Sequence, residues 1–189
     1  MLLGRYRTAL RLCDAALTYD HDPRERGGLL MVQVSIWAQS GEWDHALRRI
    51  ADIMSDAEQR QHGLTYSGVE IGRCAILSAR GEATDEVDAS LAEATATFGA
   101  TRHTMSLLRA CFVRAKHEAS VGREAQAIRS FEEAEALASA SEYWAAWAAV
   151  RGCRARLLAR LGRVEEARAS ALDALALLAP RVKLLRVRP

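Results

Sequence analysis

Cysteine and histidine, the residue types that most often carry chemistry, are scattered along this chain. The cysteines are Cys13, Cys74, Cys111 and Cys153. They form no CxxC pair, whereas a zinc site needs closely spaced ligands and a disulfide framework is typical of small secreted chains. The histidines form no HExxH motif and no pair four residues apart. The sequence therefore predicts no metal site, and it predicts cysteines that fill the interior of a protein in a reducing compartment.

A catalytic constellation is equally hard to find. Gly27-Gly28 and the other glycines make no GxGxxG, and no GxxxxGK[ST] loop for phosphates is present. Acidic residues such as Glu132 and Glu165 are placed as expected for the solvated side of a helix. We therefore expect no enzymatic activity and no cofactor.

One short segment is unusually aromatic. Tyr143, Trp144 and Trp147 fall within five residues of a chain that is only 6% aromatic. Both Tyr143 and Trp144 can share a helical face with Trp147. Two interpretations stay open: the three rings pack against the preceding helices at Phe131 and Leu137, or they form a hot spot for a partner.

Composition limits the remaining function classes. The chain has 189 residues, of which 50% are hydrophobic and 26% charged, as in an ordered globular protein. Its net charge of +2 makes no strong electrostatic case for nucleic acid or for an anionic membrane. Arginines interrupt the N-terminal apolar residues, and no window is apolar enough for a membrane span. We expect a cytoplasmic protein with no membrane partner.

The elements that position these residues are repeated. A pattern of Gly, any residue, a usually aromatic or apolar residue, two polar residues and Ala occurs five times, at spacings of 37 to 41 residues. Its glycines are Gly4, Gly41, Gly81, Gly122 and Gly162. The third copy departs from the pattern, since Glu86 stands where Ala is expected, and the fourth has Glu124 at the apolar place. Such regular self-similarity indicates a repeat architecture.

Each copy predicts two helices with a turn between them. The Gly ends one helix, because a left-handed C-terminal residue costs least without a side chain. Apolar residues with a period of 3.6 follow, as in Trp43, Ala46 and Ile50. No strand signal appears. We expect an all-α chain of about nine helices, with a lone helix at 5–19 followed by four antiparallel pairs, and with breaks near 20–28, 55–63, 97–103 and 138–142. Asp22-Pro23 and Ser141 mark helix starts.

Aligned columns before each Gly add detail. The residue seven before it is always small or modest in size and should be buried; these residues are Val34, Cys74, Ala115 and Ala155. His117 replaces Ile or Leu in another apolar column, which favours a buried, hydrogen-bonded histidine over a pH sensor. Eight before Gly stand Gln33, Arg73, Arg114 and Arg154. We expect an ion-pair ladder with nearby glutamates, or a slight rotation of the helices, rather than a track for phosphates.

The Gly-x-aromatic-x-x-Ala pattern resembles the tetratricopeptide repeat family. A further small residue follows seven positions on at Ala16, Ala134 and Ala174, although Ile53 and Glu93 depart from it. The resemblance covers nearly the whole chain and implies a superhelix, or solenoid, of antiparallel helix pairs. The period near 40 exceeds the family's usual 34. This longer variant is similar to the helical-repeat regions of bacterial LuxR-type and MalT-like transcriptional regulators.

The resemblance also implies a partner-binding groove on the first helices of the pairs. It places residues thirteen, ten, six and two before each Gly in that groove. Among them are Met31, Ser35, Gln39, Arg109, Phe112, Lys116, Arg156 and Arg160. The N-terminal half of such a groove is small and apolar, and its C-terminal half is basic with one aromatic ring. A peptide with an acidic or C-terminal carboxylate group would suit the basic half; the alternative is that these are solvated charges.

The ends complete the expectation of a single repeat domain. Its units are predicted near 1–22, 23–58, 59–99, 100–140 and 141–180, with a basic tail at 181–189. The first unit has almost no first helix, which should expose an apolar edge at Tyr6, Leu10, Cys13 and Leu17 and favours a homo-oligomer through that edge.

The sequence thus favours a non-catalytic scaffold that binds a protein or peptide, in the manner of a regulatory or sensory module of a bacterial transcriptional regulator. Two alternatives stay open: a helical repeat that binds nucleic acid, and a superhelix that senses a small ligand. Steep salt dependence of nucleic-acid binding would identify the first alternative.

Overall fold

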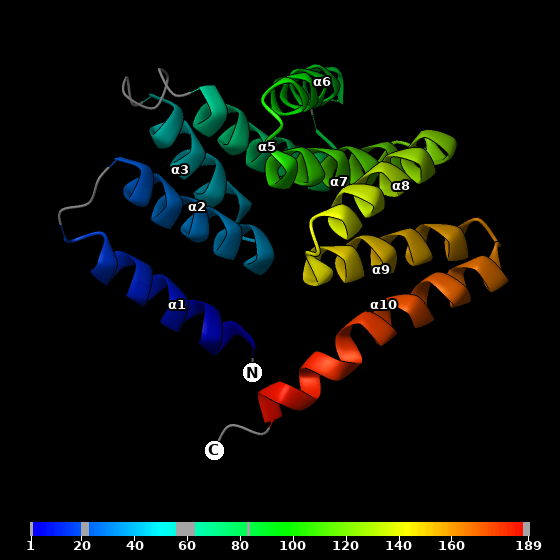
Figure 1. The fold of residues 1–189 in the computed structure, drawn as a ribbon. Coiled ribbons are helices and arrows are strands. Elements are labelled where there is room, and N and C mark those ends of the chain that lie inside the picture. The colour runs from blue at the N-terminus through cyan, green and yellow to red at the C-terminus, as the bar shows by residue number, and fades with distance from the viewer. Residues whose placement is uncertain (1, 20–22, 56–62, 83, 187–189) are drawn as a thin grey trace. The chain divides into compact units, whose positions relative to one another are not determined.

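The computed structural model describes residues 2–19, 23–55, 63–82 and 84–186, and the side chains of 6–19, 29–55, 66–82 and 84–179. All regular structure in these ranges is helical, which confirms the all-α prediction, and the described residues form nine helices (Figure 1). The chain divides into two compact units, residues 1–80 and 81–189. Among the described residues, no helix combines the length and hydrophobicity needed to span a bilayer.

The first unit contains four helices. They are α1 (Leu2–Ala16), α2 (Pro23–Ser40), α3 (Trp43–Ser55) and α5 (Gly63–Arg80). α1 packs on α2, α2 packs on α3, and α5 packs against both α2 and α3. Their apolar stripes meet in a core of Val34, Ala46, Ile50, Ile53, Val69 and Ile76. Ala46 is fully buried, because a small residue at this place lets the two helices of a pair approach closely.

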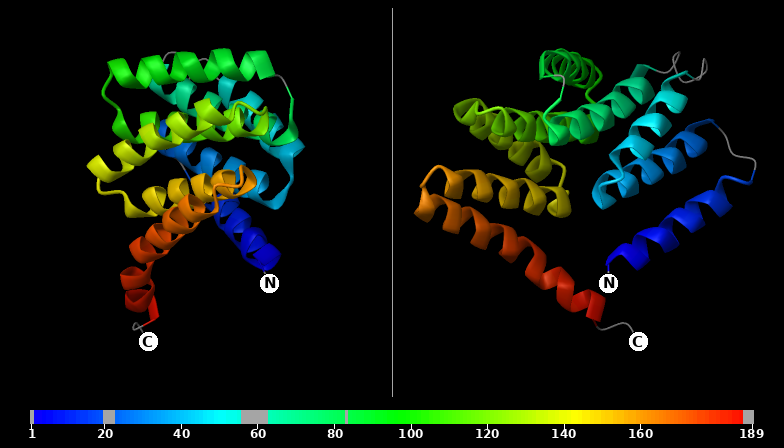
Figure 2. Two further views of the ribbon diagram at one scale, coloured as in Figure 1. Left: turned by 90° about the vertical axis from the view of Figure 1, so that its right-hand side faces the viewer. Right: turned by 180° about the vertical axis from the view of Figure 1, so that it is seen from behind.

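The second unit contains five helices. They are α6 (Thr84–Ala100), α7 (Thr104–Ser120), α8 (Glu124–Ala140), α9 (Trp144–Arg160) and α10 (Val164–Arg186). Each packs against the next in the chain, and α7 also touches α9. Short turns make neighbouring helices run in opposite directions, as both views of Figure 2 show, so α7 and α9 run in the same direction.

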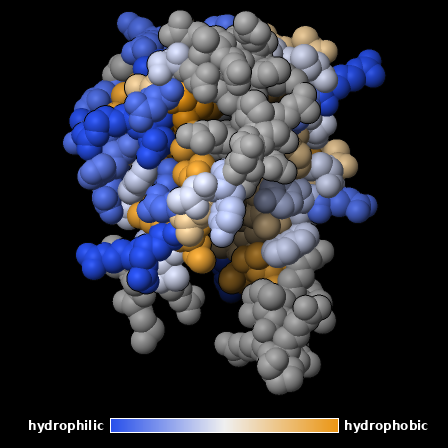
Figure 3. All heavy atoms as spheres, turned by 90° about the vertical axis from the view of Figure 1, so that its left-hand side faces the viewer, coloured by the Kyte–Doolittle hydropathy of each residue, from blue (hydrophilic) through white to orange (hydrophobic). Residues whose placement is uncertain are grey.

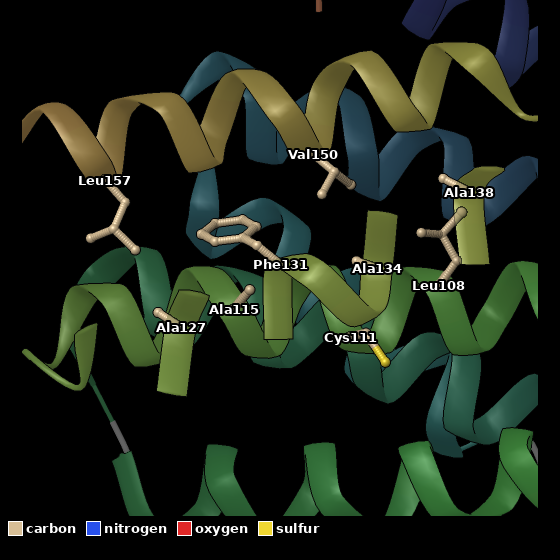
Figure 4. Packing of buried hydrophobic residues seen from close by; sticks show 9 residues of the cluster. All are labelled: Leu108, Cys111, Ala115, Ala127, Phe131, Ala134, Ala138, Val150 and Leu157. Atoms are coloured by element: carbon tan, nitrogen blue, oxygen red, sulfur yellow. The ribbon is translucent and has the colours of Figure 1, made fainter. Parts of the chain in front are cut away.

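The core of the second unit lies where α7, α8 and α9 meet (Figure 4). It comprises Leu108, Cys111, Ala115, Ala127, Phe131, Ala134, Ala138, Val150 and Leu157. Phe131 of α8 extends between α7 and α9 and is only 1% exposed. The small residues around it leave room for this ring, which is the one buried aromatic side chain of the cluster.

The repeat glycines end helices as predicted. Gly41, Gly81, Gly122 and Gly162 have φ between +73° and +83°. At Gly122 the next amide, Arg123 N–H, donates to the Glu118 carbonyl at 2.8 Å, which satisfies a carbonyl that the helix leaves unpaired. Gly4 differs, because it lies inside α1.

The turns between pairs use the same geometry without glycine. Arg102 and Glu142 have φ of 53° and 54°. The amides that follow them, those of His103 and Tyr143, donate to the carbonyls of Phe98 and Ala138, both at 3.0 Å. Side chains rarely adopt this conformation, so the sequence predicts breaks near 97–103 and 138–142 without indicating which residue is left-handed.

Two boundary predictions near the helix starts are wrong. Ser141 does not open a helix: it caps the end of α8, and its hydroxyl donates to the Leu137 carbonyl at 2.8 Å. The break predicted at 20–28 is too long, because α2 already begins at Pro23, where a proline costs the helix no hydrogen bond.

The C-terminal boundary also differs from the prediction. The segment expected to be a tail after Pro180 continues α10 as far as Arg186. Residues 187–189 of that predicted tail lie outside the described residues. The five unit boundaries predicted along the chain stay a prediction.

Hydrophobic side chains reach the surface in places, and on the face drawn in Figure 3 they lie between hydrophilic ones. The apolar edge expected on α1 is not the one observed. Cys13 is buried and Tyr6, Leu10 and Leu17 are half-buried, whereas Leu12 and Tyr19 are exposed. α1 turns the predicted stripe inward because it packs on α2. Self-association of the chain stays a prediction.

Candidate functional site

The arginines that stand eight residues before a repeat Gly form ion pairs. Arg114 of α7 pairs with Glu133 and donates to Ser130, both of α8. Arg154 of α9 contacts two α8 carboxylates, Glu132 at 3.0 Å and Glu135 at 3.3 Å.

The N-terminal members of this column also have side-chain partners. Arg73 pairs with Glu70, three residues earlier on α5. Gln33, the uncharged member, donates to Asp14 at 2.6 Å. The predicted interhelical ladder is confirmed for Arg114 and Arg154, whereas Arg73 pairs within its own helix.

His117 is buried as expected. It is 1% exposed, and its Nε2 lies 3.3 Å from Oδ1 of Asp88 on α6. The other oxygen of Asp88 accepts from Arg123 at 2.7 Å, a hydrogen bond that raises the pKa of the Arg123 guanidinium. A histidine in this apolar column therefore ties α6 to α7 rather than facing solvent.

A different set of cations lacks such partners. Lys116, Arg156 and Arg160, all predicted to face the groove, line a pocket of about 270 Å³ between α7 and α9. We call it the cationic pocket; its lining residues are Lys116, Ala119, Ser120, Phe131, Cys153, Arg156, Leu157 and Arg160.

The contacts of these three cations are with uncharged groups. Lys116 Nζ lies 5.8 Å from the centre of the Phe112 ring. Arg156 contacts the sulfur of Cys153 at 3.0 Å, and Arg160 reaches from α9 to the Ala119 carbonyl at 3.1 Å. Among the described residues, none of the three has a carboxylate partner. Their charge is therefore uncompensated by the side chains of their own unit.

A second, mainly apolar pocket lies beside the first and has a volume of about 370 Å³. We call it the apolar pocket; its lining residues are Met105, Ser106, Leu108, Arg109, Phe112, Tyr143, Ala146 and Val150. The Phe112 ring borders it, 6.2 Å from the Phe131 ring of the cationic pocket. We call the two pockets together the α7–α9 groove.

Arg109 is the one cation of the apolar pocket. Desolvation by its surroundings lowers the pKa of its guanidinium, although the residue as a whole stays exposed. Arginine titrates so high that it keeps its charge. Arg109 makes no ion pair with a described residue.

The thiols near the groove differ in exposure. Burial raises the pKa of Cys111, which lies in the core behind the groove, so this thiol stays protonated near neutral pH. Cys153 is half-buried in the cationic pocket, and none of the four cysteines, all of which the structure describes, forms a disulfide. No cluster of three or more potential metal ligands occurs among the described residues.

Other sequence candidates lie elsewhere. Met31 packs against the core of the first unit, and the Ser35 hydroxyl donates to the Met31 carbonyl at 2.9 Å. Gln39 is exposed and accepts from Tyr6 at 3.4 Å. These three residues belong to the first unit and do not line the α7–α9 groove.

The aromatic segment splits between two environments. Tyr143 is 45% exposed and lines the apolar pocket. Trp147 packs on the core that contains Phe131 and Leu137, and Arg151 lies over its ring at 5.1 Å. Trp144 is half-buried and lines neither pocket. The packing interpretation holds for Trp147, and Tyr143 is the member positioned to meet a ligand.

Some lining residues were missed from the sequence. Phe131 was assigned only to the core, and Cys153 only to the interior, yet both form walls of the cationic pocket. Cys153 follows Gly152, a predicted groove position, which is the one signal that pointed to it. Met105 and Val150 fall on helix faces that the repeat columns do not mark as groove-facing.

A further hollow lies in the first unit, beside Trp37, His45 and Arg49. Of its two arginines, Arg49 pairs with Asp52 at 3.5 Å and lies over the Trp37 ring, which leaves only Arg48 without a carboxylate partner among the described residues. The α7–α9 groove, with its unpaired cations, is therefore the better candidate site.

Comparisons of the sequence leave the site to be interpreted from its own geometry: no protein-family model matches the chain, and no curated protein matches it either.

Proposed function

We propose that the chain is a non-catalytic module that binds an acidic protein segment or peptide in the α7–α9 groove. One observation carries this proposal: Lys116, Arg156 and Arg160 converge on one pocket without a carboxylate, while other arginines of the same helices are paired. A carboxylate ligand would supply the charge-assisted hydrogen bonds that these groups lack.

The helix ends account for part of this charge. Arg160 lies in the last turn of α9, where cations interact favourably with the helix dipole, and Lys116 and Arg156 lie just before the last turns of α7 and α9. That interaction is worth only about 0.3–1 kcal/mol per exposed group and fills no space. It therefore leaves the pocket able to take an anion.

The proposal agrees with the resemblance of the sequence to tetratricopeptide repeats. Given the similarity with bacterial transcriptional regulators, we further propose that the chain is the sensory module of such a regulator. In such a protein the groove would be the sensory part, and its occupation would be passed to attached domains. Four cysteines that form no disulfide suit the reducing cytoplasm that we propose as its compartment.

The test is binding of the full chain to an array of random twelve-residue peptides. We expect bound peptides to be enriched in Asp and Glu, with weaker binding at higher salt. The triple charge reversal Lys116→Glu, Arg156→Glu and Arg160→Glu should weaken binding at least tenfold, because it replaces attraction by repulsion in the pocket.

A matched control has the same net charge. Arg48→Glu, Arg129→Glu and Arg168→Glu reverse three exposed arginines that line neither pocket of the groove. We expect binding within about twofold of the unchanged chain. Equal loss in both triple variants, or tight binding of a single-stranded oligonucleotide with steep salt dependence, would contradict the proposal and favour a nucleic-acid ligand.

A further inference from the structure

The two pockets of the α7–α9 groove are aligned along the helices, and this alignment restricts what can occupy both. On α7 the apolar pocket is lined by residues 105–112 and the cationic pocket by residues 116–120. On α9 the corresponding ranges are 143–150 and 153–160. Residue numbers thus rise from the apolar to the cationic pocket on both helices.

This order follows from the fold. α7 and α9 are each antiparallel to α8 and so run in the same direction, as the sequence of labels in Figure 4 shows. The N-terminal halves of both helices border the apolar pocket, and the C-terminal halves border the cationic pocket. The groove is therefore chemically polarised along its length.

The separation of the pockets can be estimated from helix geometry. Their centres are about ten residues apart on each helix, which at about 1.5 Å per residue corresponds to about 15 Å. An extended peptide advances about 3.3 Å per residue, so four or five residues span this distance. Side chains of an extended chain alternate between two faces, and both pockets open on the same groove. Only an even spacing places two side chains in them, and four is the even number closest to the estimate.

The pocket volumes agree with an extended ligand. About 270 and 370 Å³ are sizes for one or two side chains each, whereas a helix is about 10–12 Å across. Resting on the peptide-binding function proposed above, we infer that the ligand is an extended segment with an apolar side chain and a carboxylate four positions apart. The apolar side chain contacts Met105, Phe112 and Tyr143, and the carboxylate meets Lys116, Arg156 and Arg160.

The test is a series of capped ten-residue Gly/Ser peptides, each with one Phe and one Asp. The spacing between these two residues runs from two to eight, in both orders along the peptide. Affinity for the full chain is measured by competition with a fluorescent acidic peptide at low salt. We expect a maximum at four in one of the two orders, with spacings of three and five at least threefold weaker, because either Phe or Asp then points away from the groove.

Two variants assign the ends of the ligand. Phe112→Ala should remove the advantage of Phe over Ala in the spacing-four peptide but leave the advantage of Asp over Asn. Lys116→Ala should do the reverse, and Arg129→Ala, outside the groove, should change neither. Loss of both advantages in each variant would contradict two separate pockets.

The outcomes separate this inference from the proposed function. Affinity that depends on Asp and on the groove cations but not on spacing would overturn the inference and leave the function standing. A maximum at a spacing of seven or eight would also overturn it, since residues at that spacing share one face of a helix, whereas in an extended chain they lie about 25 Å apart, well beyond the separation of the pockets. If the acidic probe itself does not bind, the proposed function fails, and the inference fails with it.

Discussion

Phe131 serves two purposes, because one side of its ring fills the core of the second unit and another forms a wall of the cationic pocket. Its neighbour Phe112 lies 6.2 Å away but is only half-buried, at the boundary between the two pockets. The two residues have the same side chain and differ in what surrounds it. Substituting each of them in turn therefore separates the contribution of core packing to stability from the role of the groove in binding.

We predict that Phe131→Ala lowers the free energy of unfolding by about 3–5 kcal/mol, because the small residues around the ring cannot close the cavity it leaves. Phe112→Ala should cost less than half as much, since part of that ring already meets water. Urea unfolding followed by circular dichroism measures both. Equal losses would mean that Phe131 is not the ring on which the core depends.

At the scale of the element, each helix pair depends on a left-handed residue that ends its first helix. Gly122 has φ of +80°, and a Cβ added there would meet no atom within 4 Å. Gly152, inside α9, has an ordinary helical backbone and equally free space. The two glycines therefore differ in backbone conformation and not in crowding.

We predict opposite effects of the same substitution at these two sites. Gly122→Ala should destabilise the chain by about 1–2 kcal/mol, because an L-residue is strained in the left-handed conformation. Gly152→Ala should stabilise it by about 0.5–1 kcal/mol, because alanine loses less backbone entropy in a helix. Thermal melts of the two variants are the measurement, and a shift of the same sign in both would contradict the turn geometry.

Much of the helical architecture was predictable because its signals are local. A glycine at each turn, a small residue five positions later and a buried column seven positions earlier were all read from the sequence, and Ala46, Ala127 and Ala115 are fully buried. Arg102 and Glu142 escaped prediction, since a left-handed residue with a side chain leaves no compositional mark. Ser141 misled for a related reason, as serine is common at both kinds of helix end.

The site was predictable only in part. The columns identified Arg109, Lys116 and Arg156, because their spacing on one helix face is a property of the sequence. They also predicted ion pairs for Arg114 and Arg154, as observed, but they did not distinguish whether the groove cations themselves would be paired or unpaired. That distinction depends on where the acidic residues of α8 lie in space. Because the columns do not show the surroundings of a residue in space, they also placed Met31 and Ser35 in the predicted groove, although neither lies near comparable charge.

At the scale of the whole molecule, the chain forms two compact units whose boundary falls at Gly81. This repeat copy has Glu86 in the place of the usual Ala. The second unit contains its own core and both pockets of the groove. In helical repeats, stability comes mainly from contacts between successive units, so a subset with intact interfaces can fold.

We predict that residues 81–189 fold without the first unit. The fragment should show helical circular dichroism and a single cooperative urea transition, and it should bind the acidic peptides of the array with affinity close to that of the full chain. Phe131→Ala in the fragment serves as the control that abolishes the transition. A fragment that is unfolded in buffer would show that the second unit depends on the first.

Because the chain has so few lysines, the groove can be labelled selectively at Lys116. Lys116 and Lys183 are the only lysines, so apart from the N-terminal amine they carry all the primary amines of the protein. Lys116 lies between the two pockets, above the Phe112 ring. An activated ester or a photoreactive crosslinker that acylates amines will therefore mark this groove without engineered residues, and any bound molecule that shields Lys116 will be registered by mass spectrometry as a missing adduct.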